Sequence, residues 1–171
     1  MKLHELPARA EGGGFHVVVE SPRGSPLKLK YEPDPGFIFG GRALPLGHTY
    51  PYDFGFVPGT RADDGDPVDA LVYWDVPSHP GVVLVCRALG VLELDQEDEG
   101  ERVRNDRVVV VPIGHARGED VRSILDLQER VREELAHFFT SSVFFTGKDA
   151  RPLGWKGPDA AQALVARSAR R

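Results

Sequence analysis

The sequence contains one cysteine, Cys86, and no long apolar run. A lone cysteine excludes a disulfide framework and a cysteine-based zinc site. No stretch approaches the roughly 18 apolar residues of a membrane helix, and residues 1–14 lack the apolar segment of a signal peptide. The six histidines are scattered without the spacing of metal ligands. These absences predict a cytoplasmic protein with no membrane partner.

The chain also lacks an excess of basic residues, because its formal net charge is −5. A nucleic-acid surface built on phosphate neutralisation needs clustered positive charge, and here basic residues are not grouped with aromatics along the predicted strands. We therefore expect no nucleic-acid partner. An apolar fraction of 41% and a length of 171 residues are typical of a globular protein and predict a single domain spanning residues 1–171.

The sequence does contain one conspicuous acidic loop, Asp63–Ala70, in which four carboxylates fall within seven positions around Gly65 and Pro67. Burying ionised carboxylates near one another is costly unless cations compensate for the lost water. Oxygen-only ligands suit hard cations such as Mg²⁺, Mn²⁺ or Ca²⁺. A solvated acidic turn is the alternative. The metal site is favoured because the loop leads directly into the apolar, strand-like run Val68–Tyr73.

Alternating and β-branched segments predict several short strands. In residues 27–32 the alternation places Lys28, Lys30 and Glu32 on one face, which is either a functional face or a solvated one. Gly90 interrupts the longest apolar run and predicts a bend or a β-bulge there. The predicted strands span residues 15–20, 27–32, 37–39, 68–73, 82–94 and 108–112.

Turn and helix signals complete the predicted fold. Gly40-Gly41 predicts a turn that presents Arg42. Apolar spacing predicts a helix over residues 127–139 with Asp126 as its N-cap. A second helix is predicted over Pro158–Ser168, where proline suits the first turn. Short strands followed by two helices predict an α+β fold with a small antiparallel barrel.

A set of further segments occurs in one consistent order along the chain: Val17–Glu20, Lys30–Glu32, Arg42, Tyr50-Pro51, Phe54-Gly55, Asp64–Asp69, Gly90–Leu92 and Ala136–Phe139. Together these segments resemble the family I soluble inorganic pyrophosphatases, of which this chain looks like a divergent member. The resemblance covers roughly residues 14–165, and Asp64–Asp69 matches the family signature without exception.

The resemblance implies an α+β fold with a small five-stranded antiparallel OB-like β-barrel flanked by two main helices. It also implies hydrolysis of inorganic pyrophosphate to two phosphates, with several Mg²⁺ ions per subunit, although Mn²⁺ or another divalent ion is possible. A homo-oligomer is expected, hexameric by resemblance to bacterial members.

Site roles also follow from the resemblance. Asp64 and Asp69 would bind the metals that generate the nucleophilic water, and Asp66 would accept its proton. Glu20 and Glu32 would hold further metal ions, directly or through water.

The phosphate side of the site carries both matches and departures. Lys30, Arg42 and Tyr50 resemble the family's catalytic phosphate-contacting groups. Asn105 stands where the family has a metal-binding aspartate, so one metal should bind more weakly. Arg107 stands where the family has a lysine, which keeps the charge but changes a point donor into a planar fork.

Further departures follow in the hairpin and after the first helix. We align Asp98, in preference to Asp95, with the family's other metal-binding aspartate of the hairpin. Phe54 replaces a tyrosine, and Ser142-Val143 replaces a Tyr-Lys pair that would bind phosphate. Lys148 is the nearest lysine that could replace the lost charge.

These departures leave three hypotheses. The chain is a Mg²⁺-dependent pyrophosphatase, a metal-dependent hydrolase of another phosphoanhydride, or a non-catalytic binding protein with the same fold.

Overall fold

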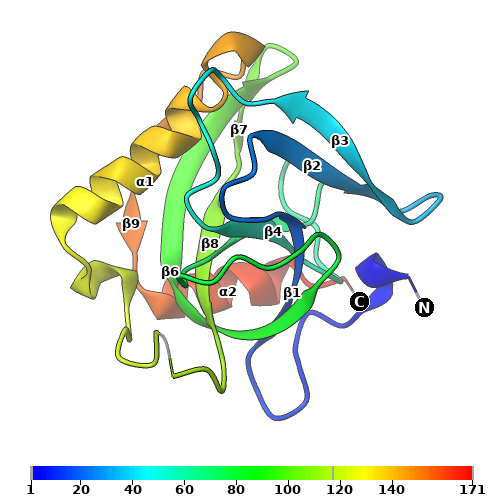
Figure 1. Ribbon diagram of the computed structural model, residues 1–171, viewed down its shortest axis with the longest axis vertical. Coiled ribbons are helices and arrows are strands. Elements are labelled where there is room, and N and C mark those ends of the chain that lie inside the picture. Colours follow the sequence, from blue (N-terminus) through cyan, green and yellow to red (C-terminus); the bar gives the residue numbers. More distant parts are fainter. Residues whose placement is uncertain (1, 117, 171) are drawn as a thin grey trace.

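The structure is a computed structural model that describes residues 2–116 and 118–170 (Figure 1). Its strands are β1 (Phe15–Ser21), β2 (Leu27–Glu32), β3 (Phe37–Ala43), β4 (Asp53–Val57), β5 (Val68–Val72), β6 (Val83–Asp98), β7 (Glu101–Arg104), β8 (Arg107–Pro112) and β9 (Arg151–Lys156). Its helices are α1 (Glu129–Ser141) and α2 (Pro158–Ser168), and its short 3₁₀ turns are η1 (Leu3–Glu5), η2 (Ile124–Asp126) and η3 (Phe144–Thr146).

Five of these strands close on themselves. β1 pairs with β4, β4 with β5, β5 with β8, β8 with β6, and β6 returns to β1. The β5–β8 pair is parallel and the other pairs of this ring are antiparallel. β7 and β9 are added to β6, and β2 pairs with β3 as a separate two-stranded sheet.

The predicted α+β class is therefore confirmed, but the sheet is not a clean five-stranded antiparallel barrel. The reason is the length of β6, which at 16 residues runs past the ring, so that its second half pairs with β7 and β9 instead. Figure 1 shows β6 curving along the molecule, with α1 beside its upper part and α2 above its lowest curve.

The sheet buries both of its faces, which explains its nearly continuous apolar runs. Along β8, Val108 and Val110 belong to a core that includes Leu164 and Val165 of α2. The intervening Val109 and Val111 belong to a second core, which includes Leu135 and Phe139 of α1. Alternate residues of one strand thus anchor the two helices on opposite faces.

The bulge predicted at Gly90 is present, because the register between β6 and β8 shifts between Ala88 and Gly90. A β-carbon at Gly90 would lie 2.3 Å from Cγ2 of Ile124 and 2.4 Å from the carbonyl oxygen of Lys156. Only glycine allows η2 and β9 to approach β6 so closely.

The turn predicted at Gly40-Gly41 is wrong, because β3 runs through both residues. Lys28 pairs with Arg42 and Leu29 pairs with Gly40, so Gly41 is left out of the register as a bulge. A β-carbon at Gly41 would lie 2.9 Å from the carbonyl oxygen of Lys28. Gly41 thus serves a close approach of the two strands rather than a chain reversal.

The N-cap predicted at Asp126 is also wrong, because α1 begins at Glu129 with Gln128 as its N-cap. Asp126 ends η2 instead, where its Oδ2 accepts a hydrogen bond of 3.1 Å from the backbone N–H of Ser123. The second helix, α2, spans Pro158–Ser168 as predicted. No helix of the described residues is long and apolar enough to span a membrane.

Candidate active site

The acidic loop is a defined turn held by backbone contacts. Gly65 has φ of +88°, which favours glycine, and the backbone N–H of Asp66 donates to Oδ1 of Asp64 at 3.1 Å. The N–H of Ala62 donates to the carbonyl of Asp66 at 2.7 Å. The N–H of Val68, where β5 begins, donates to the buried Thr60 hydroxyl at 2.9 Å. These contacts fix the directions of the carboxylates.

A cavity of about 180 Å³ collects side chains from β1, β2, the acidic loop, β5, the segment before β8 and the loop after α1. Of the residues predicted to act in the site, eight line it: the carboxylates Glu20, Glu32, Asp64, Asp66 and Asp69, the amide Asn105, and the lysines Lys30 and Lys148. The resemblance therefore named residues that the fold brings together.

The carboxylates of this cavity oppose one another's ionisation. Burial, and then the charge of Asp69, raises the pKa of Glu20 to about 7, although a 2.6 Å hydrogen bond from the N–H of Tyr31 opposes this shift. Burial and Asp69 also raise the pKa of Asp64. The cavity therefore carries an excess of negative charge that a bound cation would relieve.

The donor set fits a hard divalent cation by its chemistry, because its ligands are carboxylate and amide oxygens. Within residues 2–116 and 118–170, no three His, Cys, Asp or Glu side chains lie close enough together to hold a metal ion as they stand. Asp69 already has a cationic partner, so a metal that used it would compete with that partner.

This partner is Arg107, the first residue of β8. Its Nη1 forms an ion pair with Asp69 and donates to the side-chain oxygen of Asn105, as well as to the Asn105 carbonyl at 3.0 Å. The guanidinium lies 5.9 Å from the ring centre of Phe54 and 5.7 Å from that of Phe139. Arg107, predicted to contact phosphate, thus does not line the cavity but contacts two residues that do, Asp69 and Asn105.

Arg42 and Tyr50, also predicted to contact phosphate, do not line the cavity either. Nη1 of Arg42 donates to the carbonyl of Ser142 at 2.8 Å, so it ties β3 to the end of α1. Tyr50 is buried, stacks on Phe54 at 5.4 Å and contacts Phe138 at 5.3 Å edge-on. Burial raises the pKa of Tyr50 to about 12. The ring of Tyr50 is therefore packed in the aromatic core.

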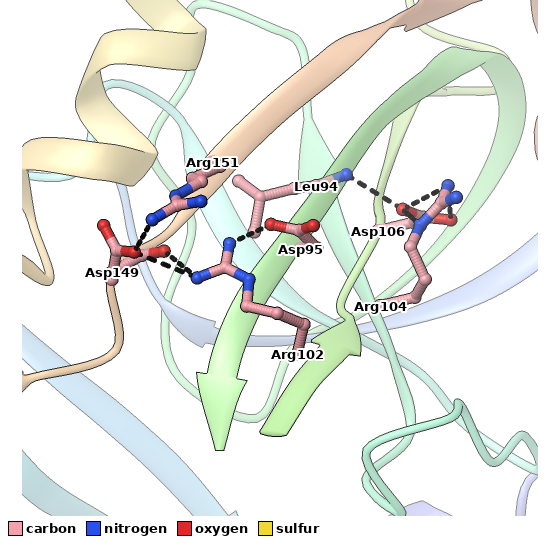
Figure 2. A network of polar contacts seen from close by, with 7 residues as sticks. All are labelled: Leu94, Asp95, Arg102, Arg104, Asp106, Asp149 and Arg151. Carbon is pink, nitrogen blue, oxygen red and sulfur yellow. Dashed lines mark hydrogen bonds and ion pairs between the residues drawn. The ribbon is translucent and has the colours of Figure 1, made fainter. Parts of the chain in front are cut away.

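The hairpin aspartate Asp98 lies at the end of β6, exposed and opposite Glu101, and does not line the cavity. Its alternative, Asp95, pairs with Arg102 (Figure 2). Strand alternation explains Asp95, because Leu94 and Gln96 occupy the buried face of β6 here. Asp98 follows Gln96 on that face but is exposed because it is the last residue of the strand, next to the hairpin turn. The polar residue that the hairpin buries is an amide, Gln96.

Lys148 reaches the cavity from an irregular loop that is held at its C-terminal end. Its carbonyl accepts a 2.6 Å hydrogen bond from the N–H of Glu97. The next residue, Asp149, has φ of +40°; Nη1 of Arg102 donates to its carbonyl at 2.9 Å and to its Oδ2 at 3.1 Å. Arg151 binds the same carboxylate at 2.6 Å (Figure 2). The hairpin therefore fixes the backbone that carries Lys148.

Asp106, next to Asn105, faces away from the cavity. Its Oδ1 accepts a hydrogen bond of 2.9 Å from the N–H of Leu94. Nη2 of Arg104 donates to both oxygens of its carboxylate at 2.9 Å (Figure 2). It therefore does not replace the charge that Asn105 lacks.

Sequence reasoning did not name Lys28 among the site residues, although Lys28 also lines the cavity. The signal that could have found it is the alternation of residues 27–32, which places it on the face of Lys30 and Glu32. Because the resemblance contains no residue at this position, the pattern alone pointed to it.

Fold and site together define a class: a small α+β protein whose strand ring carries an acidic cavity suited to a divalent cation, bordered by lysines. Residues 17–171 match the family described as Inorganic pyrophosphatase. An inorganic pyrophosphatase of Synechocystis sp. is 39% identical over 165 residues, which are 96% of this chain and 95% of that protein. The crystal structure of inorganic pyrophosphatase from Thermus thermophilus superposes with a TM-score of 0.88 at 36% identity, covering 98% of both chains. This chain belongs to the inorganic pyrophosphatase family.

Proposed function

We propose that the protein is a Mg²⁺-dependent enzyme that hydrolyses inorganic pyrophosphate to two phosphates. Its family and the names of its relatives support the substrate. The observation that carries the proposal is the joint presence of five carboxylates and the lysines Lys28, Lys30 and Lys148 around one cavity. A divalent cation is expected for this family. A highly charged anion such as pyrophosphate needs the carboxylates, which hold the cation, and the lysines, which neutralise phosphate oxygens.

Asp64, Asp69, Glu20 and Glu32 would hold the divalent ions, of which Mg²⁺ is the first choice, and Asn105 would add a neutral oxygen. The bound ions would lower the pKa of a water and neutralise phosphate oxygens.

The chain's own proton acceptor is Asp66. Its carboxylate lies 3.4 Å from Nζ of Lys30, and both side chains are about half exposed, so this ion pair is weak. Burial opposes the shift, but Asp66 raises the pKa of Lys30 above its usual value. Lys30 thus stays charged to stabilise phosphate oxygens, while Asp66 takes the proton of the attacking water. Lys148 adds a second positive charge. Arg42 and Tyr50 would reach phosphate only after a rearrangement.

The test is phosphate release from pyrophosphate with Mg²⁺ in the wild type and in Asp66→Asn. We expect turnover to fall at least about 100-fold, the usual loss for a general base, with pyrophosphate still bound. Asp63→Asn is the matched control, because Asp63 is an exposed acid of the same loop outside this cavity. Normal turnover in Asp66→Asn would refute the assigned role.

The second candidate, a non-catalytic binding protein, is favoured by one contact, the ion pair of Arg107 with Asp69. Phosphate release measured across several divalent ions separates the two. Pyrophosphate binding by calorimetry without turnover in any ion would establish the second. Faster turnover of another phosphoanhydride in the same assay would instead reassign the substrate.

We also infer that the protein is cytoplasmic and that residues 1–171 form one domain in a homo-oligomer, a hexamer by family resemblance. Light scattering after size exclusion measures the assembly, and a single cooperative unfolding transition would support one domain.

A further inference from the structure

Lys28 differs from its neighbour Lys30 in its partners, although both line the cavity from β2. Lys30 has the carboxylate of Asp66 at 3.4 Å. The Lys28 ammonium forms no hydrogen bond or ion pair with any other residue that the structure describes. It is therefore a half-buried cation without a direct partner, which is an unfavourable state unless a ligand supplies one.

Three cations act on the charge of Lys28, as do the carboxylates of Asp69 and Glu20. Burial lowers the pKa of Lys28 most; Asp69 opposes this shift, and the charges of Arg107, Lys148 and Arg42 lower the pKa further. This collection of positive charge repels itself and attracts an anion.

Strand register sustains this repulsion. Lys28 lies directly opposite Arg42 across the β2–β3 pair, and like charges in this position destabilise a hairpin. At the bulge the two strands are so close that a β-carbon on Gly41 would lie 2.9 Å from the carbonyl oxygen of Lys28. The pairing of the two strands therefore keeps Lys28 next to Arg42.

The position of Lys148 is independently fixed. The N–H of Glu97 donates to the Lys148 carbonyl, which holds its backbone from the hairpin side. Arg102 holds the next residue, Asp149, from the same side (Figure 2). Two lysines from distant parts of the chain thus line one cavity, each carried by a backbone segment that is held in place.

We propose that Lys28 is a phosphate-binding residue of the active site, acting with Lys148 on oxygens of the pyrophosphate. This inference rests on the proposed function and adds a specificity-determining residue to it. A phosphate group presents several anionic oxygens at once and so satisfies two ammonium groups with which no carboxylate of residues 2–116 and 118–170 pairs directly. The positive charge absent at Ser142-Val143 is thereby supplied from β2.

The experiment compares Lys28→Met, Lys28→Arg and Lys156→Met with the wild type. Methionine keeps the apolar stem, and arginine keeps the charge. Lys156 is an exposed lysine of β9 outside the cavity, so Lys156→Met makes the same change in net charge. Binding of methylenediphosphonate, which is not hydrolysed, is measured by calorimetry with Mg²⁺, and KM and kcat are measured with pyrophosphate.

We expect Lys28→Met to weaken methylenediphosphonate binding and raise KM about tenfold, as for a lost charge-assisted hydrogen bond, while kcat changes less than KM. Lys28→Arg should retain most of the affinity. The melting temperature of Lys28→Met should be unchanged or higher, because an unpaired cation is removed. A purely structural role would lower it. Lys28→Gln replaces the methionine variant if the latter does not fold.

Affinity and KM within twofold of Lys156→Met would overturn the assignment of Lys28 and leave the proposed function intact. Weakened binding in Lys28→Met without pyrophosphate hydrolysis by the wild type would overturn the proposed function and support Lys28 as a phosphate ligand.

Discussion

The acidic side of the cavity comes mainly from one short segment, whereas the basic side is assembled from distant ones. Asp64, Asp66 and Asp69 lie within one turn and the start of β5. Lys28 and Lys148 come from β2 and from the loop after α1. A contiguous segment carries its own geometry in its turn residues, but a dispersed set depends on how every contributing element packs.

The same difference appears in the departures from the family. The acidic segment matches the family signature in full, while the departures, Asn105, Arg107 and Ser142-Val143, are spread over other parts of the chain. A dispersed set of cations tolerates such exchange, because a phosphate group accepts positive charge from any direction that reaches it. The three experiments below test this contrast, from the largest expected effect to the smallest.

The largest effect is expected where the two sides touch, in Asp69→Asn. The side chain of Arg107 is only 10% exposed and would lose its anion, so we expect the free energy of unfolding to fall by about 3 kcal/mol. Asp64→Asn should cost much less, because Asp64 has no cationic partner within the described residues. Urea unfolding without metal measures both. Equal losses would show that Arg107 does not depend on Asp69.

A smaller effect is expected from pH in the metal-free protein. The pKa of Glu20 is about 7 in the folded protein against an ordinary value of 4.5, so the folded state holds its proton more tightly. This contribution is fully present below pH 4.5 and is lost as pH rises through 7. The full shift corresponds to about 3 kcal/mol; because Glu20 lines an open cavity, we expect a loss of about 2 kcal/mol, and Glu20→Gln should abolish it. Thermal unfolding in EDTA from pH 4.5 to 8 measures the slope; an unchanged slope in Glu20→Gln would contradict the assignment.

The smallest effect is expected in Asn105→Asp, which gives Arg107 a second carboxylate and frees Asp69 for a metal. We expect Mg²⁺ to bind about tenfold more tightly, since affinity rises with the charge of the ligands. Calorimetric titration with Mg²⁺ measures this. Gln128→Glu adds the same charge at an exposed position away from the cavity and should change nothing. Unchanged Mg²⁺ affinity in Asn105→Asp would mean that Arg107 does not limit metal binding.

Local patterns predicted much of the fold. The apolar run of β5, the bulge at Gly90 and the span of α2 were all predicted from residue periodicity, glycine and proline. The strand β4 was not, because its aromatic and glycine-rich sequence is equally typical of a loop. The strand β9 was missed for the same reason, since it begins with Arg151-Pro152 and contains Gly154.

The candidate site divides in the same way. The carboxylates of the acidic loop were predictable, because neighbours along a chain stay neighbours in space. Asp98, Arg42 and Tyr50 do not line the cavity, because a resemblance assigns a position in the sequence but not the direction of a side chain. In this chain, the hairpin end of β6, a hydrogen bond to the end of α1 and aromatic packing decide those directions.

The sequence by itself determined the acidic turn, its approach to β5 and the family, since these rest on consecutive residues and on backbone preferences of glycine and proline. Only the tertiary structure decided that Arg107 pairs with Asp69 and that Lys28 meets Lys148 in one cavity. Each of these pairs is separated by more than thirty residues, and only the packing of β2, β5, β8 and the loop after α1 brings their charges together.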